Sequence, residues 1–178
     1  MKRITLLLAL FIMGITTYAQ SHDVGSSTTR TDAFGNQKTT HRDRYGNVTG
    51  TSTTSTDAFG KTKTVHQDRN GQVIGTSYTS KDMFGNTTTQ HQNRYGGTTG
   101  SSRTSTDAFG NTHTTYSSAT GQRTGSSTTS TDAFGNKKTT YQNANGKTIG
   151  SSTQTKDAFG NQTTRQRASS TGTSIWTW

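Results

Sequence analysis

The pentapeptide Asp32-Ala33-Phe34-Gly35-Asn36 (DAFGN) returns with little change at a fixed interval of 25 residues. An unvarying period of this length is typical of proteins built by repeating one supersecondary unit. The 25-residue unit is therefore the element from which the fold is predicted. Its later copies begin at Asp57, Asp82, Asp107, Asp132 and Asp157.

Each copy has the residues of a type I turn closed by a left-handed glycine. Asp at the first position can bond back to the backbone, and Gly adopts the positive φ that the fourth position requires. Three-residue loops of this kind connect the strands of β-hairpins. The predicted structural turn residues are Asp32, Gly35, Asp57, Gly60, Asp82, Gly85, Asp107, Gly110, Asp132, Gly135, Asp157 and Gly160.

A weaker form of the same pentapeptide lies midway through each unit, as in Asp43-Arg44-Tyr45-Gly46-Asn47. Thr-rich segments such as residues 37–41 and 50–56 separate the turns, and their β-branched residues favour strands. The longer segment of each unit carries a glycine, which we interpret as the extra residue of a β-bulge that restores register between unequal strands. These glycines are Gly50, Gly75, Gly100, Gly125 and Gly150.

The predicted fold class is all-β, with tandem 25-residue two-strand repeats that form an extended antiparallel meander. The alternative is a flattened β-solenoid, in which equivalent residues of successive units stack about 4.8 Å apart. The hairpin turns favour the meander. The column of His41, His66, His91, Tyr116 and Tyr141 favours the solenoid.

The first residues have the pattern of a secretory signal peptide, with Lys2 and Arg3 before the apolar run of residues 4–15 and a cleavage site after Ala19. This run is short for a bilayer span, so we expect no membrane span after signal cleavage. The predicted organisation is a signal peptide (1–19), a lead-in (20–24), six tandem repeats of which the last is incomplete (25–167), and a C-terminal tail (168–178). The predicted localisation is secreted or cell surface.

After the predicted signal peptide the chain contains no Leu, Pro, Glu or Cys. A compact domain of this length normally buries roughly two thirds of the surface of its unfolded chain, and these residues offer too little apolar material for that. We therefore expect a sheet held by Thr and aromatic cross-strand pairs rather than by an apolar core.

The two turn pentapeptides, Asp32 to Asn36 and Asp43 to Asn47, resemble the Asp-x-x-Gly-Asn core of tyrosine-aspartate (YD) repeats. These repeats occur in large bacterial cell-surface and toxin-shell proteins and form long β-hairpin sheets. The chain also resembles, in architecture alone, curli-type fibre subunits, which are secreted chains of two-strand repeats rich in Ser, Asn, Gln and Gly. Both resemblances imply an extracellular structural role.

The residue pattern argues against an enzyme. All nine acidic residues are Asp, and six of them hold the same turn position. No carboxylate pair and no Ser, His and Asp grouping stands outside the repeat. His41, His66 and His91 could bind a metal only if their rings converged on one ion, and we interpret them as a packing rung. We predict no catalytic residue, no cofactor and no metal site.

The charge balance suggests polyanionic partners. Seventeen Lys and Arg follow residue 19 against nine Asp, which gives the mature chain a net charge of +8. A regular basic array attracts acidic polysaccharide or extracellular DNA in a salt-dependent manner. No base-reading motif is present, so we expect this binding to be without sequence specificity.

An open sheet also leaves an unpaired strand at each end, and such edges pair with other chains. We predict self-association in which the tail with Trp176 and Trp178 meets the first strand, near residues 25–31, of the next chain. The sequence therefore predicts a secreted structural or adhesive β-repeat protein of the cell surface or extracellular matrix. The alternative is a polyanion-binding extracellular module.

Overall fold

The computed structural model describes residues 23–169, and the predicted all-β class is confirmed. Every strand is antiparallel to the strands beside it. The twelve strands are β1 (Asp23–Thr31), β2 (Gln37–Asp43), β3 (Val48–Thr56), β4 (Thr62–Asp68), β5 (Val73–Lys81), β6 (Thr87–Asn93), β7 (Thr98–Thr106), β8 (Thr112–Ser118), β9 (Arg123–Thr131), β10 (Lys137–Asn143), β11 (Thr148–Lys156) and β12 (Gln162–Ala168).

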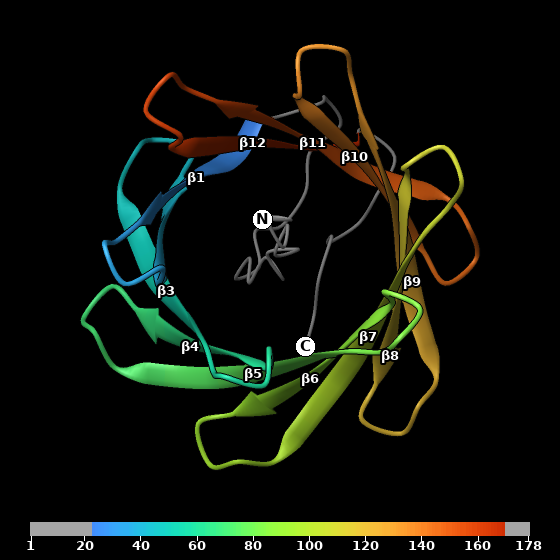
Figure 1. Ribbon diagram of the computed structural model, residues 1–178, viewed down its shortest axis with the longest axis horizontal. Helices are drawn as coiled ribbons and strands as arrows, with labels where there is room; N and C mark the ends of the chain where they lie inside the picture. The colour runs from blue at the N-terminus through green and yellow to red at the C-terminus, as the bar shows by residue number, and fades with distance from the viewer. Residues whose placement is uncertain (1–22, 170–178) are drawn as a thin grey trace.

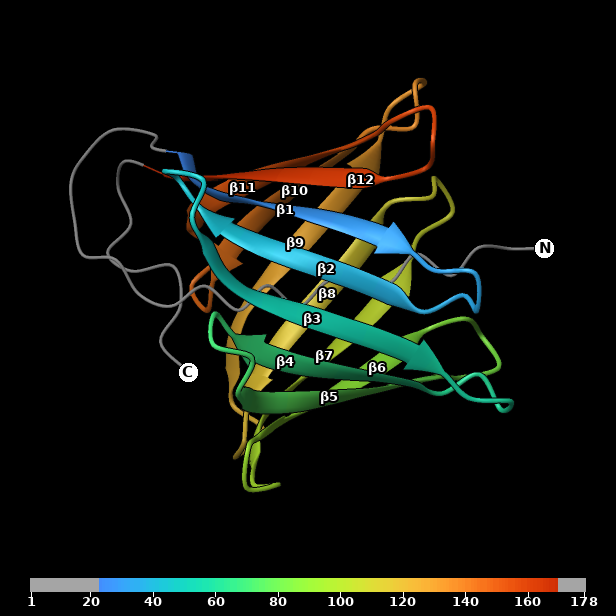
Figure 2. The ribbon, with the colours of Figure 1, turned by 90° about the vertical axis from the view of Figure 1, so that its left-hand side faces the viewer.

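The sheet closes on itself, because β1 pairs with β12 as well as with β2 (Figures 1 and 2). The strands follow one another in the order of a meander, but the expectation of an extended open sheet is wrong. The solenoid alternative is not found either, since an antiparallel strand separates the equivalent strands of successive units. The edge near residues 25–31 is therefore paired, and the tail with Trp176 and Trp178 lies outside the described residues.

Repeated bulges explain why the sheet closes. Opposite β2, the register of β3 shifts between Gly50 and Val48, and the same shift recurs at the glycines of β5, β7, β9 and β11. A bulge bends its strand and increases the local twist. Equal bends at equal intervals curve a sheet in one direction, as designed barrels do deliberately.

The ladder between the first and last strands continues this pattern. Gly25 of β1 pairs with Gln166 of β12, and the register shifts between Asp23 and Gly25. Gln166 stands 25 residues after Tyr141 and thus occupies the column of His41, which pairs with Gly50 in the same way. Closure therefore preserves the repeat, so that six equivalent hairpins form a ring.

Close backbone approach explains why the bulge position is glycine. A Cβ atom on Gly50 would lie 2.4 Å from the backbone oxygen of Gln67 on β4, and one on Gly75 would lie 2.6 Å from that of Gln92. Atoms of a neighbouring backbone cannot give way as a flexible side chain can. A larger residue would therefore force the two strands apart.

The inner face of the barrel is polar. Its buried residues are mostly Ser and Thr, and the only buried hydrophobic side chains within residues 23–169 are Tyr116 and Ile149. Thr54 and Thr64 share a buried hydroxyl hydrogen bond of 2.8 Å across β3 and β4. The equivalent Thr pairs join β1 to β2, β5 to β6, β7 to β8 and β9 to β10.

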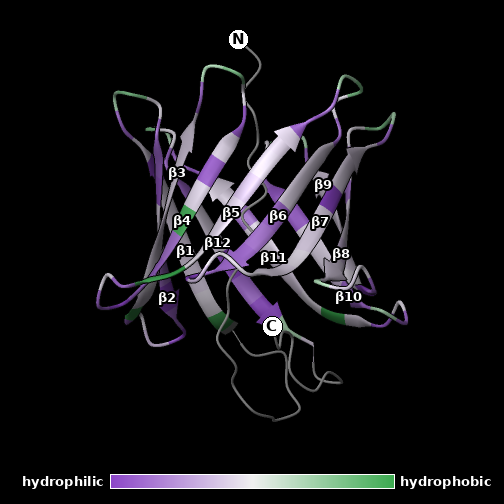
Figure 3. Ribbon diagram, turned by 90° about the horizontal axis from the view of Figure 1, so that it is seen from below, coloured by the Kyte–Doolittle hydropathy of each residue, from purple (hydrophilic) through white to green (hydrophobic). Residues whose placement is uncertain are grey.

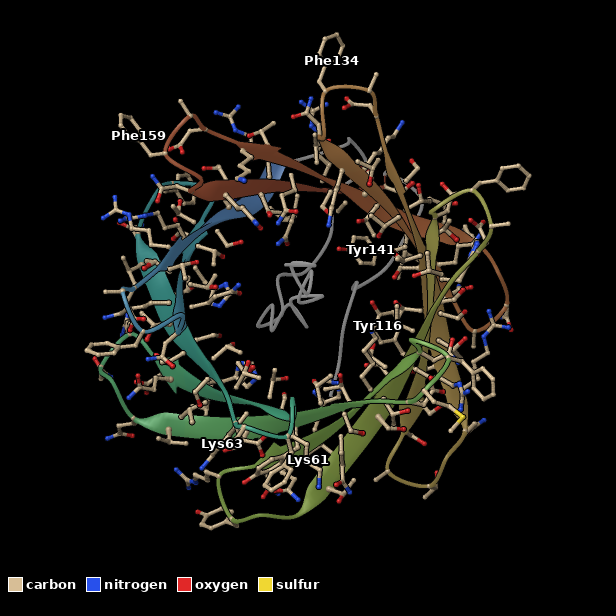
Figure 4. The ribbon with its side chains drawn as sticks, viewed as in Figure 1. Lys61, Lys63, Tyr116, Phe134, Tyr141 and Phe159 are labelled. Atoms are coloured by element: carbon tan, nitrogen blue, oxygen red, sulfur yellow. The ribbon has the colours of Figure 1, made fainter. Side chains whose placement is uncertain are left out.

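Across the described residues, each strand contacts only the two strands to which it is hydrogen-bonded. Tyr116 and Tyr141 point into the ring (Figure 4), yet they bond to Ser127 and Ser152 on adjacent strands. The barrel is therefore stabilised by ladders and nearest-neighbour side-chain pairs, each worth about 0.2 to 1 kcal/mol. This agrees with the composition, which lacks residues for an apolar core.

The outer face is mostly polar, because most residues between the buried ones of each strand are Thr, Ser, Gln and cations, with Val65 of β4 and Tyr78 of β5 as exceptions. On β2, Lys38 and Arg42 are exposed, whereas Thr39 between them is buried. Within residues 23–169 there is no helix of the length and apolarity needed to cross a membrane.

Candidate contact site on the two rims

The antiparallel order of the strands places all six DAFGN turns at one end of the barrel. We call this end the Phe rim and define it as residues 32–36, 57–61, 82–86, 107–111, 132–136 and 157–161. The opposite end, the far rim, holds the five turns at residues 43–47, 68–72, 93–97, 118–122 and 143–147. Figure 3 shows apolar residues at the turn tips of one end, above strands that are largely polar.

Each turn of the Phe rim satisfies its own polar groups. The carboxylate of Asp32 accepts hydrogen bonds from the backbone N–H groups of Phe34 (2.9 Å) and Asn36 (2.8 Å). Its second oxygen accepts the Asn36 side-chain amide at 3.0 Å. The backbone N–H of Gly35 donates to the Asp32 carbonyl at 3.1 Å, and Gly35 has a φ of 84°.

The other five turns have the same backbone bonds, with glycine φ values from 76° to 87°. The structure thus brings every Asp and Gly chosen from the sequence to one rim: Asp57, Gly60, Asp82, Gly85, Asp107, Gly110, Asp132, Gly135, Asp157 and Gly160 join the first pair. One turn differs in detail. Lys61 replaces the final Asn, so Asp57 bonds to backbone N–H groups at both positions without a side-chain amide.

In the five turns that keep the final Asn, these hydrogen bonds lower the pKa of the Asp carboxyl and favour its ionised form. The side-chain amide of Asn36 is the main cause that lowers the pKa of Asp32 below its usual range. At Asp107 the amide of Asn111, aided by the His113 ring at 3.2 Å, lowers the pKa to about 2. The carboxylates are thus part of the turn and are already occupied by its donors.

The third position of each turn projects its side chain into solvent. Phe134 and Phe159 point away from the ring at the tips of their turns (Figure 4). The exposed fractions are 91% for Phe34, 91% for Phe59, 83% for Phe84, 91% for Phe109, 90% for Phe134 and 92% for Phe159. Met83, beside Phe84, is equally exposed at 91%. The Phe rim therefore presents six phenylalanine side chains to water around one end of the barrel.

Lysines lie close behind these tips. Of the eight lysines within residues 23–169, seven lie in the turns or strand halves of the Phe rim: Lys38, Lys61, Lys63, Lys81, Lys137, Lys138 and Lys156. Lys61 is part of a turn, and Lys63 extends from the outer face of β4 over the Tyr78 ring, with Nζ 5.9 Å from its centroid (Figure 4). The Phe rim thus combines apolar tips with ammonium groups.

The far rim uses the same backbone turn but different side chains. The position of Phe is taken by Tyr45, Asn70, Tyr95, Thr120 and Asn145. Six of the nine arginines within residues 23–169 lie at this end: Arg42, Arg44, Arg69, Arg94, Arg123 and Arg167. Arg44 and Arg94 lie over the rings of Tyr45 and Tyr95, with Cζ 4.8 Å and 4.6 Å from the centroids.

The His column forms a hydrogen-bonded belt on the inner face, toward the far rim. His41 Nε2 and His66 Nδ1 both lie 2.9 Å from the Ser52 hydroxyl. His66 Nε2 and His91 Nδ1 lie at the same distance from Ser77. A Ser hydroxyl can donate to one ring and accept from the next, so neutral imidazoles satisfy this chain in a single direction.

Burial keeps these rings neutral. It lowers the pKa of His66 to about 4, with further lowering by His41 and His91, and it also lowers the pKa of both of those neighbours. Within residues 23–169, no three His or Asp side chains gather in a way that could hold a metal ion. The belt links its His rings through the Ser hydroxyls of the strands between them.

The chain matches no protein-family model, no curated protein and no solved structure. Reasoning from the sequence identified the Asp and Gly of each turn but assigned no role to Phe. The signal was present, because Phe occupies its position in all six main turns while the five half-repeat turns vary there.

Proposed function

We propose that this chain is a secreted adhesive protein of the cell surface or extracellular matrix, and that the Phe rim is its contact surface. The observation that carries the proposal is the exposure of six phenylalanines at equivalent positions on one end of a closed ring. Apolar side chains exposed singly are normal on protein surfaces, but six at equivalent positions on one end form a regular pattern that chance exposure does not explain. Six equal contacts carried by one ring also raise the overall affinity through multivalency.

The far rim supports this assignment, because its turns show which side chains the backbone turn itself requires. Its turns carry Thr120 or Asn145 where the Phe rim carries Phe, with the same backbone hydrogen bonds and glycine conformation. The turn therefore does not require an aromatic side chain. Six exposed phenylalanines are unfavourable in water, and contact with a surface accounts for them.

Adsorption to defined surfaces tests the proposal. The mature chain should be retained on an alkyl-terminated monolayer at physiological salt, and much less on a hydroxyl-terminated one. Replacing Phe with Thr in all six turns should abolish that difference, whereas the control Tyr45→Thr/Tyr95→Thr should keep it. Equal retention of the six-Phe variant and the parent would show that the Phe rim is not the contact surface.

A second function, polyanion binding, is favoured by the arginines of the far rim. Guanidinium groups pair with phosphate and sulfate in bidentate fashion and stack on aromatic rings. We propose that acidic polysaccharide or DNA binds at this end without sequence specificity.

Heparin and duplex DNA titrations over a range of salt concentrations test this second function. Arg44→Gln/Arg94→Gln should lower the steepness of the salt dependence by about one unit per arginine removed. Lys63→Gln/Lys138→Gln is the matched control at the other end. Salt-independent binding, or an equal effect of both pairs, would contradict an arginine site at the far rim.

A further inference from the structure

The shape of the Phe rim restricts what it can contact. Its six tips stand on separate turns around a ring, and each turn is two strands away from the next. Neighbouring strands lie about 4.8 Å apart, so adjacent tips are separated by about 10 Å or more. Figure 4 shows Phe134 and Phe159 directed outward from the ring. Widely spaced tips on a circle match an extended flat surface better than a peptide or a groove.

The polar chemistry of the turns restricts the partner further. The Asp32 carboxylate already holds two backbone N–H groups and the Asn36 amide, and four of the other turns repeat these bonds. Sugars are recognised by hydrogen bonds in addition to stacking, and Phe, unlike Tyr and Trp, has no polar atom. The tips therefore offer apolar contact alone, which an apolar phase satisfies.

The positive charges behind the tips favour an anionic partner. The rim half of the barrel carries nine Lys and Arg, the seven lysines with Arg30 and Arg103, against the six Asp of the turns. Lysines near a membrane surface extend their ammonium groups to the headgroups while their stems cover apolar surface. Each cation near an anionic bilayer contributes to binding. This arrangement, with apolar tips ahead and lysines behind, matches an anionic bilayer interface.

A second copy of the chain fits the same rim less well. Two Phe rims in contact would oppose the same nine cations to one another. Outward-directed side chains such as Phe134 and Phe159 would also remain in water at the margin of a rim-to-rim contact. The pairing of β1 with both β2 and β12 leaves no open sheet edge to extend such a contact.

We propose that the Phe rim docks on the interface of an anionic lipid bilayer without spanning it. The six phenylalanines enter the boundary of the acyl chains, and the lysines lie at the level of the headgroup phosphates. This inference rests on the proposed adhesive function of the same rim and specifies the partner. Binding then depends both on apolar area and on anionic lipid, as for other interfacial proteins.

Flotation of the mature chain with vesicles tests the inference. Vesicles of phosphatidylcholine mixed with phosphatidylglycerol should capture the chain, and vesicles of phosphatidylcholine alone should capture it more weakly. The alternate-turn variant Phe34→Thr/Phe84→Thr/Phe134→Thr should lose affinity by about tenfold for each Phe that is fully inserted in the parent. Lys63→Gln/Lys138→Gln should lose affinity only for the anionic vesicles, and Tyr45→Thr/Tyr95→Thr should bind like the parent.

Four results would overturn the inference. The first is equal capture of the alternate-turn variant and the parent. The second is association of the chain with itself in lipid-free solution that depends on Phe, because the occupant is then a second copy. The third is retention on the alkyl monolayer without capture by either vesicle, which removes the lipid partner but leaves the adhesive function standing. A chain retained on neither surface would contradict both. Unchanged circular dichroism shows that each variant is folded.

Discussion

The two rims of the barrel are built on the same backbone turn, yet only the Phe rim has the same side chain at the third position of every turn. The first and fourth positions are restricted at both ends, to Asp, Asn or Ser and to Gly. The third position is Phe in every turn of the Phe rim and is Tyr, Asn or Thr at the far rim. The positions that both rims restrict serve the turn, and we propose that the third position, which only one rim restricts to one residue, serves contact.

The largest expected effect concerns the two kinds of glycine. Gly50→Ala places a Cβ atom 2.4 Å from a backbone oxygen of the neighbouring strand, and we expect it to lower the free energy of unfolding by about 3 kcal/mol or more. Gly110 has a φ of 83° with open space around its missing Cβ, so Gly110→Ala costs about 1 to 2 kcal/mol of backbone strain.

Chemical unfolding of the parent and both glycine variants gives the two values. Gly110→Val, with a β-branched residue at the same φ, should lose more than Gly110→Ala. If Gly50→Ala unfolds like the parent, the bulge does not bring the strands as close as the ladder indicates.

Acid should act on the two ends of the barrel unequally. The pKa of buried His66 lies at about 4, below the 6.5 of the unfolded chain. The unfolded state therefore binds the proton first, so this contribution to stability is present above pH 6.5 and is lost as the pH falls toward 4. For His66 the loss reaches about 3 kcal/mol. The lowered pKa values of Asp107 and Asp132 favour the ionised carboxylates, and so the hydrogen bonds of these two turns, over that interval.

Hydrogen exchange between pH 7 and pH 4 checks whether the His belt controls this loss of stability. Amides of β2, β4 and β6 around the His belt should lose protection before those of β8 and β10, where Tyr116 and Tyr141 occupy the column. His66→Tyr should weaken the pH dependence. Uniform loss of protection around the ring would show that the belt does not control acid stability.

A smaller effect is expected where the far rim lacks the Asp and Asn pair. Ser118 bonds to the Thr120 hydroxyl at 2.8 Å rather than to backbone N–H groups two and four residues ahead. Ser118→Asp/Gln122→Asn copies the Phe rim turn and should raise the thermal midpoint slightly. A lower midpoint would mean that the side chains of the two rims are not interchangeable.

The smallest expected effect is the most informative about the comparison. Phe109→Thr copies Thr120 of the far rim at a position that is 91% exposed. We expect the free energy of unfolding to change by less than about 0.5 kcal/mol, as for other surface substitutions. A loss well above this value in a denaturant titration would give Phe a folding role.

The sequence predicts the turns, the strands and the bulges, because each depends on local residues such as Asp32, Gly35 and Gly50. Closure depends on the sum of many small bends, which no single residue reports. The repeat nevertheless contains a signal for closure. Gly25 and Gln166 continue the Gly and His columns at the two ends of the array, and they pair with each other in the closed sheet.

The candidate contact site is harder to predict than the fold. The chemistry of Asp32 and Gly35 explains the turn, but it does not explain why the residue between them is Phe34. The gathering of the six phenylalanines follows only from the alternation of the turns between two ends. The separation of lysines and arginines between those ends has the same origin, so it too required the topology.

The most direct test of the central claim is graded replacement of Phe by Thr in none, two, four or six turns of the Phe rim. Retention of each variant on the alkyl monolayer is measured at one salt concentration. Equal contacts predict that the logarithm of the affinity falls in similar steps with each pair removed, whichever turns are chosen. Retention that is unchanged across the series, or lost entirely on replacing one particular turn, would contradict a ring of six equivalent contacts.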